Sequence, residues 1–151
     1  MEGQIAKTEN SLIKFENAFT DIERTFEESG LACCTRAIPL GHRCGYVAVL
    51  KEHPLYGKTT EQLKNSEISV DGGITFADGD DDWWVIGWDA AHTWHKRDTS
   101  IMDEEFKMYY MRDKRRRNEH GKILVTPQMA EDETRRFAKQ VAKMGRELKG
   151  E

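Results

Sequence analysis

Residues 74–88 read ITFADGDDDWWVIGW and carry the clearest structural signal in the chain. Two short runs rich in β-branched and aromatic residues, 74–77 and 83–88, flank the turn-forming segment DGDDD at 78–82. Runs of this composition joined by a short polar segment are typical of an antiparallel hairpin. Alternation places Trp84, Ile86 and Trp88 on one face of the second strand. We expect one face to pack against helices and the other to be open to a ligand.

The segments around this hairpin predict more strands and three helices. Residues 46–50 and 68–70 have strand composition. Apolar residues at steps of three and four predict a helix over about 11–29. The same spacing predicts a C-terminal helix over 127–148, with Thr126 as its N-cap and Pro127 in its first turn. Residues 101–117 are predicted to form a third, basic helix. The N-terminal apolar stripe consists of Leu12, Phe15, Phe19, Ile22 and Phe26.

The predicted fold class is therefore α+β, with one small antiparallel sheet flanked by N-terminal and C-terminal amphipathic helices. A length of 151 residues suits a single domain, 1–151, and 38% hydrophobic residues suffice for one core. No apolar run approaches the roughly 20 residues that cross a bilayer, and the polar N-terminus does not resemble a signal peptide. We expect a cytoplasmic protein without a membrane partner. Three irregularly spaced cysteines suggest free thiols.

Charge is unevenly distributed along the chain. The net charge is −4, but residues 1–95 hold 8 basic and 16 acidic side chains, whereas 96–151 hold 15 basic and 11 acidic. The run 112–117 contains five cations in six residues. Such a run can contact phosphates, although a solvated helix face is the more common role. The uneven charge is compatible with an anionic ligand or an acidic partner, although two solvated helices of mixed charge are the more common explanation. We expect no long nucleic acid.

A ligand pocket is indicated between residues 41 and 92. Paired glycines, Gly72 and Gly73, weaken a strand and therefore suggest a bulge or the close approach of a ligand to main-chain amides. The loop HPLYG at 53–57 is stiffened by proline and presents an imidazole beside a phenol. Tryptophans nearby can stack on a flat ring. The alternatives are a β-bulge beside ordinary core aromatics and a plain solvent turn.

Enzyme templates are weak or missing in this sequence. Asp89, His92 and His95 have the spacing of metal ligands on a helical turn, which makes a metal-assisted hydrolase one alternative function. The chain contains no phosphate-binding loop, no dinucleotide GxGxxG motif and no GxSxG nucleophile elbow. We therefore expect no catalytic residue, no cofactor and no bound metal.

The middle of the chain resembles a widespread family of small phage and prophage proteins. The matching segments are GYV at 45–47, HPLYG at 53–57, DGGITF at 71–76, WW at 83–84 and GWDAAH at 87–92. The family pattern runs GYV, HPLYG, HGG[L/I]T[F/Y], WW and GFDCAH, and the match covers about a third of the chain in order. This family resembles the phage sponge proteins that counter cyclic-oligonucleotide immune signalling (CBASS). The resemblance implies immune evasion by a protein that binds and withholds a cyclic dinucleotide without cleaving it. The first candidate for this ligand is 3′3′-cyclic GMP-AMP.

The chain departs from this pattern at three positions. Asp71 stands where the family has histidine, Trp88 replaces phenylalanine and Ala90 replaces cysteine. An acid weakens a phosphate contact, so we expect Asp71 to accept a hydrogen bond from a purine edge or to cap the glycine turn.

Residue chemistry and the resemblance together define the predicted ligand site. Stacking candidates are Tyr46, Tyr56, Trp84 and Trp88. Backbone and hydroxyl contacts are expected from Gly72, Gly73 and Thr75, and polar edges from His53, Asp71, Asp89 and His92. The two amphipathic helices leave room for a homodimer. A third possible function is inhibition of a host protein through the helix stripes or the basic run.

Overall fold

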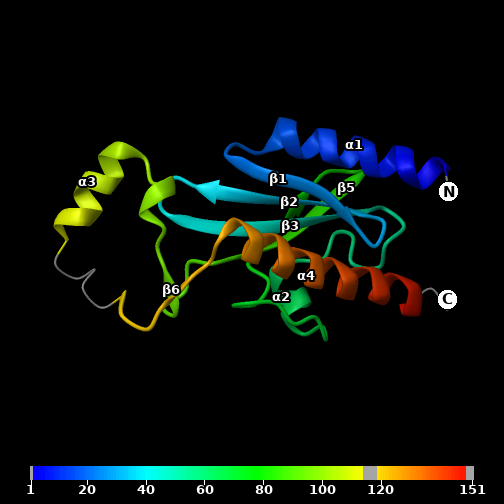
Figure 1. The fold of residues 1–151 in the computed structure, drawn as a ribbon. Coiled ribbons are helices and arrows are strands. Elements are labelled where there is room, and N and C mark those ends of the chain that lie inside the picture. The colour runs from blue at the N-terminus through cyan, green and yellow to red at the C-terminus, as the bar shows by residue number, and fades with distance from the viewer. Residues whose placement is uncertain (1, 114–118, 149–151) are drawn as a thin grey trace.

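The computed structural model describes residues 2–113 and 119–148, and the side chains of 8–113 and 119–147. Its centre is a five-stranded antiparallel sheet in the order β1-β2-β3-β5-β4, with α1 and α4 on opposite faces (Figure 1). The predicted α+β class, an antiparallel sheet with N-terminal and C-terminal helices, is therefore confirmed. The sheet strands are β1 (Ile22–Glu28), β2 (Leu31–Ile38), β3 (His42–Leu50), β4 (Phe76–Gly79) and β5 (Trp83–Asp89). The helices are α1 (Glu2–Ala18), α2 (Thr60–Lys64), α3 (Glu104–Arg112) and α4 (Pro127–Leu148).

A smaller unit extends from one end of this body. Strands β6 (His95–Lys96) and β7 (Ile123–Leu124) pair in parallel, and the 3-10 turn η1 (Thr99–Ile101) leads into α3. Helix α3 projects away from the sheet and buries none of its residues (Figure 1). Residues 114–118, which hold most of the predicted basic run, lie outside the described part of the chain. Within that part, no helix is long and apolar enough to cross a membrane.

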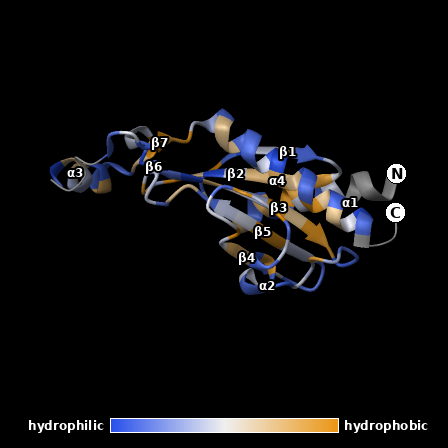
Figure 2. Ribbon diagram, turned by 90° about the horizontal axis from the view of Figure 1, so that it is seen from below, coloured by the Kyte–Doolittle hydropathy of each residue, from blue (hydrophilic) through white to orange (hydrophobic). Residues whose placement is uncertain are grey.

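Both faces of the sheet are covered, which contradicts the expected open face. On the α4 side, Val47, Ile86 and Trp88 pack in one cluster with Phe137. On the α1 side, Tyr46, Trp83 and Val85 pack in a second cluster with Phe15. Hydropathy colouring shows the apolar residues concentrated in the strands between the two helices (Figure 2). A ligand can therefore reach the central strands at their ends, where the helices stop covering them.

The C-terminal helix and the hairpin agree with the sequence-based predictions. Helix α4 covers 127–148, and the hydroxyl of Thr126 accepts a hydrogen bond from the Met129 amide, as an N-cap does. Strands β4 and β5 pair from Phe76–Gly87 to Gly79–Trp84, so the acidic segment joins them as a hairpin. The three cysteines are buried thiols, as predicted.

The predicted N-terminal helix over 11–29 is wrong in its second half. Helix α1 ends at Ala18, Asp21 takes a positive φ of 59°, and the chain continues as β1. Ser29 and Gly30 both have positive φ, as in the tight turns that join hairpin strands, and β1 returns into β2. Leu12, Phe19 and Ile22 still pack in the α1-side cluster. Four of the five stripe residues therefore form one apolar layer that continues from α1 into β1, whereas Phe26 packs on the α4 side.

Three other predicted boundaries differ from the structure. Residues 68–70 are not a strand, because the chain there runs irregularly beside α4, where Ser69 bonds with the side chain of Gln140. The run 74–77 becomes a strand only at Phe76, since its first residues follow a turn at the paired glycines. Helix α3 starts at Glu104 and ends at Arg112, with extended backbone at Asp113, so the predicted helix over 101–117 starts too early and is interrupted at Asp113.

One buried cation connects the sheet, the small unit and α4. Arg43 on β3 is only 4% exposed. Its guanidinium donates to both carboxylate oxygens of Glu23 on β1, at 2.8 and 3.1 Å. The same group donates to Asp98 at 2.7 Å and to the carbonyl oxygen of Val125 at 2.9 Å. Four segments that are distant in sequence therefore meet at one side chain.

Replacing this cation should unfold the protein much more readily than replacing an exposed one. We expect Arg43→Met to lower the free energy of unfolding by about 3–5 kcal/mol, because two carboxylates lose their buried partner. Arg24→Met is the matched control, since Arg24 pairs with Glu131 nearer the surface and such pairs contribute roughly 0–1 kcal/mol. Urea unfolding followed by circular dichroism measures both, and equal losses would contradict the central role of Arg43.

Candidate functional site

Two of the predicted stacking residues belong to the core. Tyr46 is 6% exposed and its ring lies 4.6 Å from that of Phe19 and 5.2 Å from that of Phe76. Trp88 is 1% exposed, and its indole N–H donates to the hydroxyl of Thr134 on α4 at 3.1 Å. Both rings are enclosed because the strands alternate beneath two helices. Neither ring offers a free face to a ligand, which corrects the sequence-based assignment.

His53 is a structural brace, which also corrects its assignment to a ligand. Its Nδ1 accepts the Leu55 amide at 3.0 Å, and its Nε2 lies 2.9 Å from the carbonyl oxygen of Val141 on α4. Gly145 leaves the space that the ring occupies, since a Cβ there would lie 2.8 Å from Nε2. The imidazole therefore anchors the HPLYG loop to α4.

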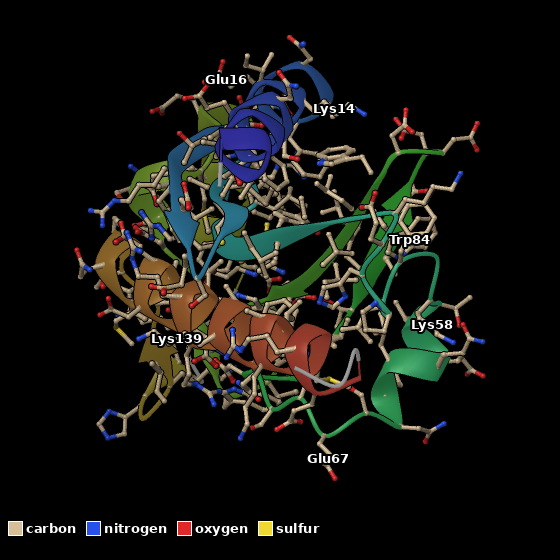
Figure 3. The ribbon with its side chains drawn as sticks, turned by 90° about the vertical axis from the view of Figure 1, so that its right-hand side faces the viewer. Lys14, Glu16, Lys58, Glu67, Trp84 and Lys139 are labelled. Atoms are coloured by element: carbon tan, nitrogen blue, oxygen red, sulfur yellow. The ribbon has the colours of Figure 1, made fainter. Side chains whose placement is uncertain are left out.

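Tyr56 and Trp84 meet at the hairpin end of the sheet. Their ring centroids are 6.0 Å apart, and the Trp84 indole donates to the carbonyl oxygen of Lys58 at 3.0 Å. Figure 3 shows Trp84 and Lys58 side by side at this edge. The Tyr56 hydroxyl donates to the carbonyl oxygen of Asp80 in the acidic turn. These aromatic residues are partly exposed, but they lie at the opposite end of β5 from the other predicted ligand residues.

Several of the other predicted residues lie together where β5 ends. Asp71, Gly72 and His92 meet there with Trp94 and His95, and we call these five residues the Asp71 cluster. The Asp71 carboxylate accepts the Trp94 indole N–H at 3.0 Å and lies 2.7 Å from Nε2 of His95. His92 stacks on Trp94 with ring centroids 4.7 Å apart and an interplanar angle of 12°. Asp71 therefore holds two rings of the chain itself.

The paired glycines form a turn and not a strand bulge. Gly72 and Gly73 have φ values of 76° and 83°, which other residues rarely adopt, and the Gly73 amide donates to the carbonyl oxygen of Val70. A Cβ on Gly72 would lie 2.1 Å from the His92 ring. The close approach that the glycine suggested is therefore made by an imidazole of the same chain.

Thr75 and Asp89 extend this cluster. The Thr75 hydroxyl donates to Asp89 at 2.6 Å, and the other carboxylate oxygen accepts the Ala91 amide at 3.0 Å. Nδ1 of His92 lies 3.8 Å from Asp89. Partial burial raises the pKa of Asp89, but these hydrogen bonds and the neighbouring imidazoles outweigh it, so its pKa lies below the ordinary value. Asp89 is therefore an anion at neutral pH.

The geometry does not favour a metal site at Asp89, His92 and His95. Nδ1 of His95 accepts the His92 amide at 3.1 Å, which places the ring proton on Nε2, beside Asp71. Neither nitrogen of His95 has a lone pair left for a metal. Among the described residues, no group of three histidine, cysteine or acidic side chains is arranged to hold an ion.

A hollow of about 310 Å³ opens beside this cluster, between the sheet end and α3. Its ionisable and aromatic lining residues are two cations, two acids, three histidines and one tyrosine: Arg97, Lys122, Asp113, Glu119, His42, His92, His95 and Tyr110. Of these, only His92 was predicted as a ligand residue, because the others come from four segments that are brought together by folding. The excess of cations after residue 95 was the one sequence signal for Arg97 and Lys122.

Arg97 organises the α3 side of the hollow. Its guanidinium lies 5.8 Å from the ring centre of Tyr110 and 5.6 Å from that of Phe106. One N–H group donates to the carbonyl oxygen of Leu40 at 2.8 Å. A guanidinium has five N–H donors, so this arrangement leaves donors for an anion while it holds two aromatic rings in place.

His42 should be neutral in the folded protein at neutral pH. Burial lowers its pKa below the ordinary 6.5, with the charge of Asp89 opposing and that of Arg97 adding to the shift. Because the pKa of His42 is lower in the folded than in the unfolded state, the neutral ring makes its full contribution to stability at pH values above the unfolded pKa. This contribution is lost as the pH falls through the folded pKa. We expect NMR titration to place the His42 pKa below 6.5 and His42→Gln to reduce the acid loss of stability. A pKa above 6.5 would contradict the burial of this ring.

Compared with protein families, curated proteins and solved structures, the chain matches none of them. The resemblance to phage sponge proteins therefore remains a prediction from the sequence motifs.

Proposed function

We propose that this protein binds and withholds a cyclic dinucleotide, such as 3′3′-cyclic GMP-AMP, without cleaving it, and so inhibits CBASS anti-phage defence. The observation that carries the proposal is the hollow beside the Asp71 cluster, where cations, imidazoles and an aromatic ring face one space. The motif resemblance names the ligand class, and the hollow provides groups of matching chemistry.

Phosphate recognition is assigned to Arg97 and Lys122. Both side chains line the hollow, and the side chain of Lys122 forms no hydrogen bond or ion pair within the described residues. A guanidinium can hold two phosphate oxygens at once, whereas an ammonium acts as a point charge. Glu119 also lines the hollow and would accept hydrogen bonds from the amino and imino edge of guanine.

Base stacking is assigned to Tyr110, in place of the buried Tyr46 and Trp88. Its ring is half-buried, stacks on Phe106 at 6.3 Å and carries Arg97 against it. Trp94, 44% exposed and held by Asp71, stacks on His92 of the hollow lining and is assigned as a second platform. Stacking on an aromatic side chain contributes roughly 1–3 kcal/mol per base.

The size of the hollow supports a two-copy arrangement. Small-molecule pockets span about 300–1,000 Å³, and 310 Å³ lies at the lower end of that range. One nucleotide of a cyclic dinucleotide would fill this hollow, and the second would meet the same hollow of another copy. We therefore propose a homodimer that binds one ligand per two chains.

Binding without cleavage accords with how the acidic and imidazole groups are used. Asp89 accepts two hydrogen bonds from the chain, and both nitrogens of His95 face partners within it. No specific observation favours the metal-assisted hydrolase. The basic run proposed as a host-protein interface falls mainly on residues 114–118, outside the described part, and the N-terminal stripe is largely packed on the sheet.

Calorimetric titration with 3′3′-cyclic GMP-AMP tests the proposal directly. We expect one ligand per two chains, and intact ligand on release by heating. Tyr110→Leu and Arg97→Met should each weaken binding by about 5- to 100-fold, because stacking and phosphate contacts of roughly 1–3 kcal/mol are lost.

Trp84→Leu and Lys58→Met are the controls, since they likewise remove one aromatic ring and one cation, but at the hairpin end of the sheet. Both should bind as the unmodified chain does. Absence of binding to any cyclic dinucleotide would sink the proposal, and release of a linear product would reassign the protein to the hydrolases. Weaker binding only in the controls would move the site to Tyr56 and Trp84.

A further inference from the structure

A second hollow, of about 350 Å³, lies at the opposite end of the sheet. Helix α1 contributes Asn10, Ser11 and Lys14 to its wall, and the end of β3 and the start of β5 contribute Leu50 and Trp83. Leu50 and Trp83 are register partners, whereas the first hollow adjoins the other end of the same ladder, where Cys44 pairs with Asp89. The two hollows are therefore separated by the length of β5. Figure 3 shows Lys14 on α1, above this end of the sheet.

Polar groups in this hollow lack partners. Ser11 is only 4% exposed and lines the hollow, yet its hydroxyl forms no hydrogen bond within the described residues. The indole nitrogen of Trp83, in the same wall, is also buried without a partner. The cost of about 1–3 kcal/mol for a buried polar group without a hydrogen bond applies to the Trp83 indole nitrogen, and such groups usually have a water or ligand partner.

Charges of opposite sign also stand unpaired there. Lys51 and Asp82 come directly after and before the Leu50–Trp83 pair and line the hollow together. Neither side chain forms an ion pair or hydrogen bond within the described residues. Lys14 differs, because it bonds to Asp80 at 3.4 Å and lies over the Trp83 ring at 5.5 Å. Glu52 also lines the hollow but is not free, so the free charges of the described lining are one ammonium and one carboxylate.

We propose that this hollow binds a free α-amino acid with an apolar side chain. The ligand carboxylate would meet Lys51 and the Ser11 hydroxyl, and its ammonium group would meet Asp82. Its side chain would lie against Leu50 and Trp83. A simple anion would be repelled by Asp82 and a simple cation by Lys51, whereas a zwitterion can pair with both charges. This inference is independent of the proposed nucleotide site.

The test is a titration with L-phenylalanine and L-leucine, followed by amide NMR. We expect shifts at residues 50–52 and 82–83, and none at His42 in the first hollow. N-acetyl-L-phenylalanine and L-phenylalanine amide, each lacking one charge, should bind about tenfold more weakly, because each loses a charged hydrogen bond. Lys51→Met and Asp82→Asn should weaken binding of the free amino acid to a similar degree.

Lys139→Met is the charge-matched control, because Lys139 lies on α4, across the sheet from Lys14 (Figure 3). It should bind both amino acids as the unmodified chain does. No shift of residues 50–52 and 82–83 at about 10 mM of either amino acid, a concentration that detects even millimolar affinity, overturns the inference. Equal binding of the acetylated and amidated derivatives overturns it as well. Loss of cyclic dinucleotide binding leaves it intact.

Discussion

The rest of the structure depends on the buried guanidinium of Arg43. A charge removed from water must be paired, and this one is paired with carboxylates on β1 and after β6. Its bond to the Val125 carbonyl oxygen also brings the start of α4 to the sheet. Asp98 is the residue next to Arg97, so the same ion pair that closes the core also sets where the first hollow has its cation. Folding and the candidate site are linked through one side chain.

Helices on both faces of the sheet restrict where this protein can bind anything. A sheet with one open face would offer its outward side chains to a ligand. Here α1 and α4 enclose both alternating sets, and the central aromatic residues become packing groups. For the central strands, what remains available are the two ends of the β3–β5 ladder. Each end has a hollow of its own, one with cations and imidazoles and one with a single unpaired charge of each sign.

About half of the residues predicted for the ligand site lie together in the structure as a connected group. Asp71, Gly72, Thr75, Asp89 and His92 do lie together, because the glycine turn and the end of β5 are neighbours in the hairpin. The assignment of Tyr46, Trp88 and His53 as ligand contacts was wrong, because composition cannot distinguish an aromatic or imidazole group that binds a ligand from one that packs in the core. Arg97, Tyr110 and Lys122, which line the first hollow, were not predicted because no local pattern links residues contributed by separate segments.

The sequence by itself determined α4 and the β4–β5 hairpin, since a cap, an apolar period and a turn segment are local signals that agree with one another. It did not determine the N-terminal region. Spacing of three and four suits a helix, yet β1 pairs with β2, and the register shift between Ile22 and Arg24 allows Ile22 and Phe26 to pack in different clusters. Only the pairing of β1 with β2 decided that outcome, because the stability of a strand depends on its hydrogen-bonded neighbour, which the local helix or strand propensity of a segment does not include. The same reason applies to both hollows, whose walls are built from segments that meet only in the folded chain.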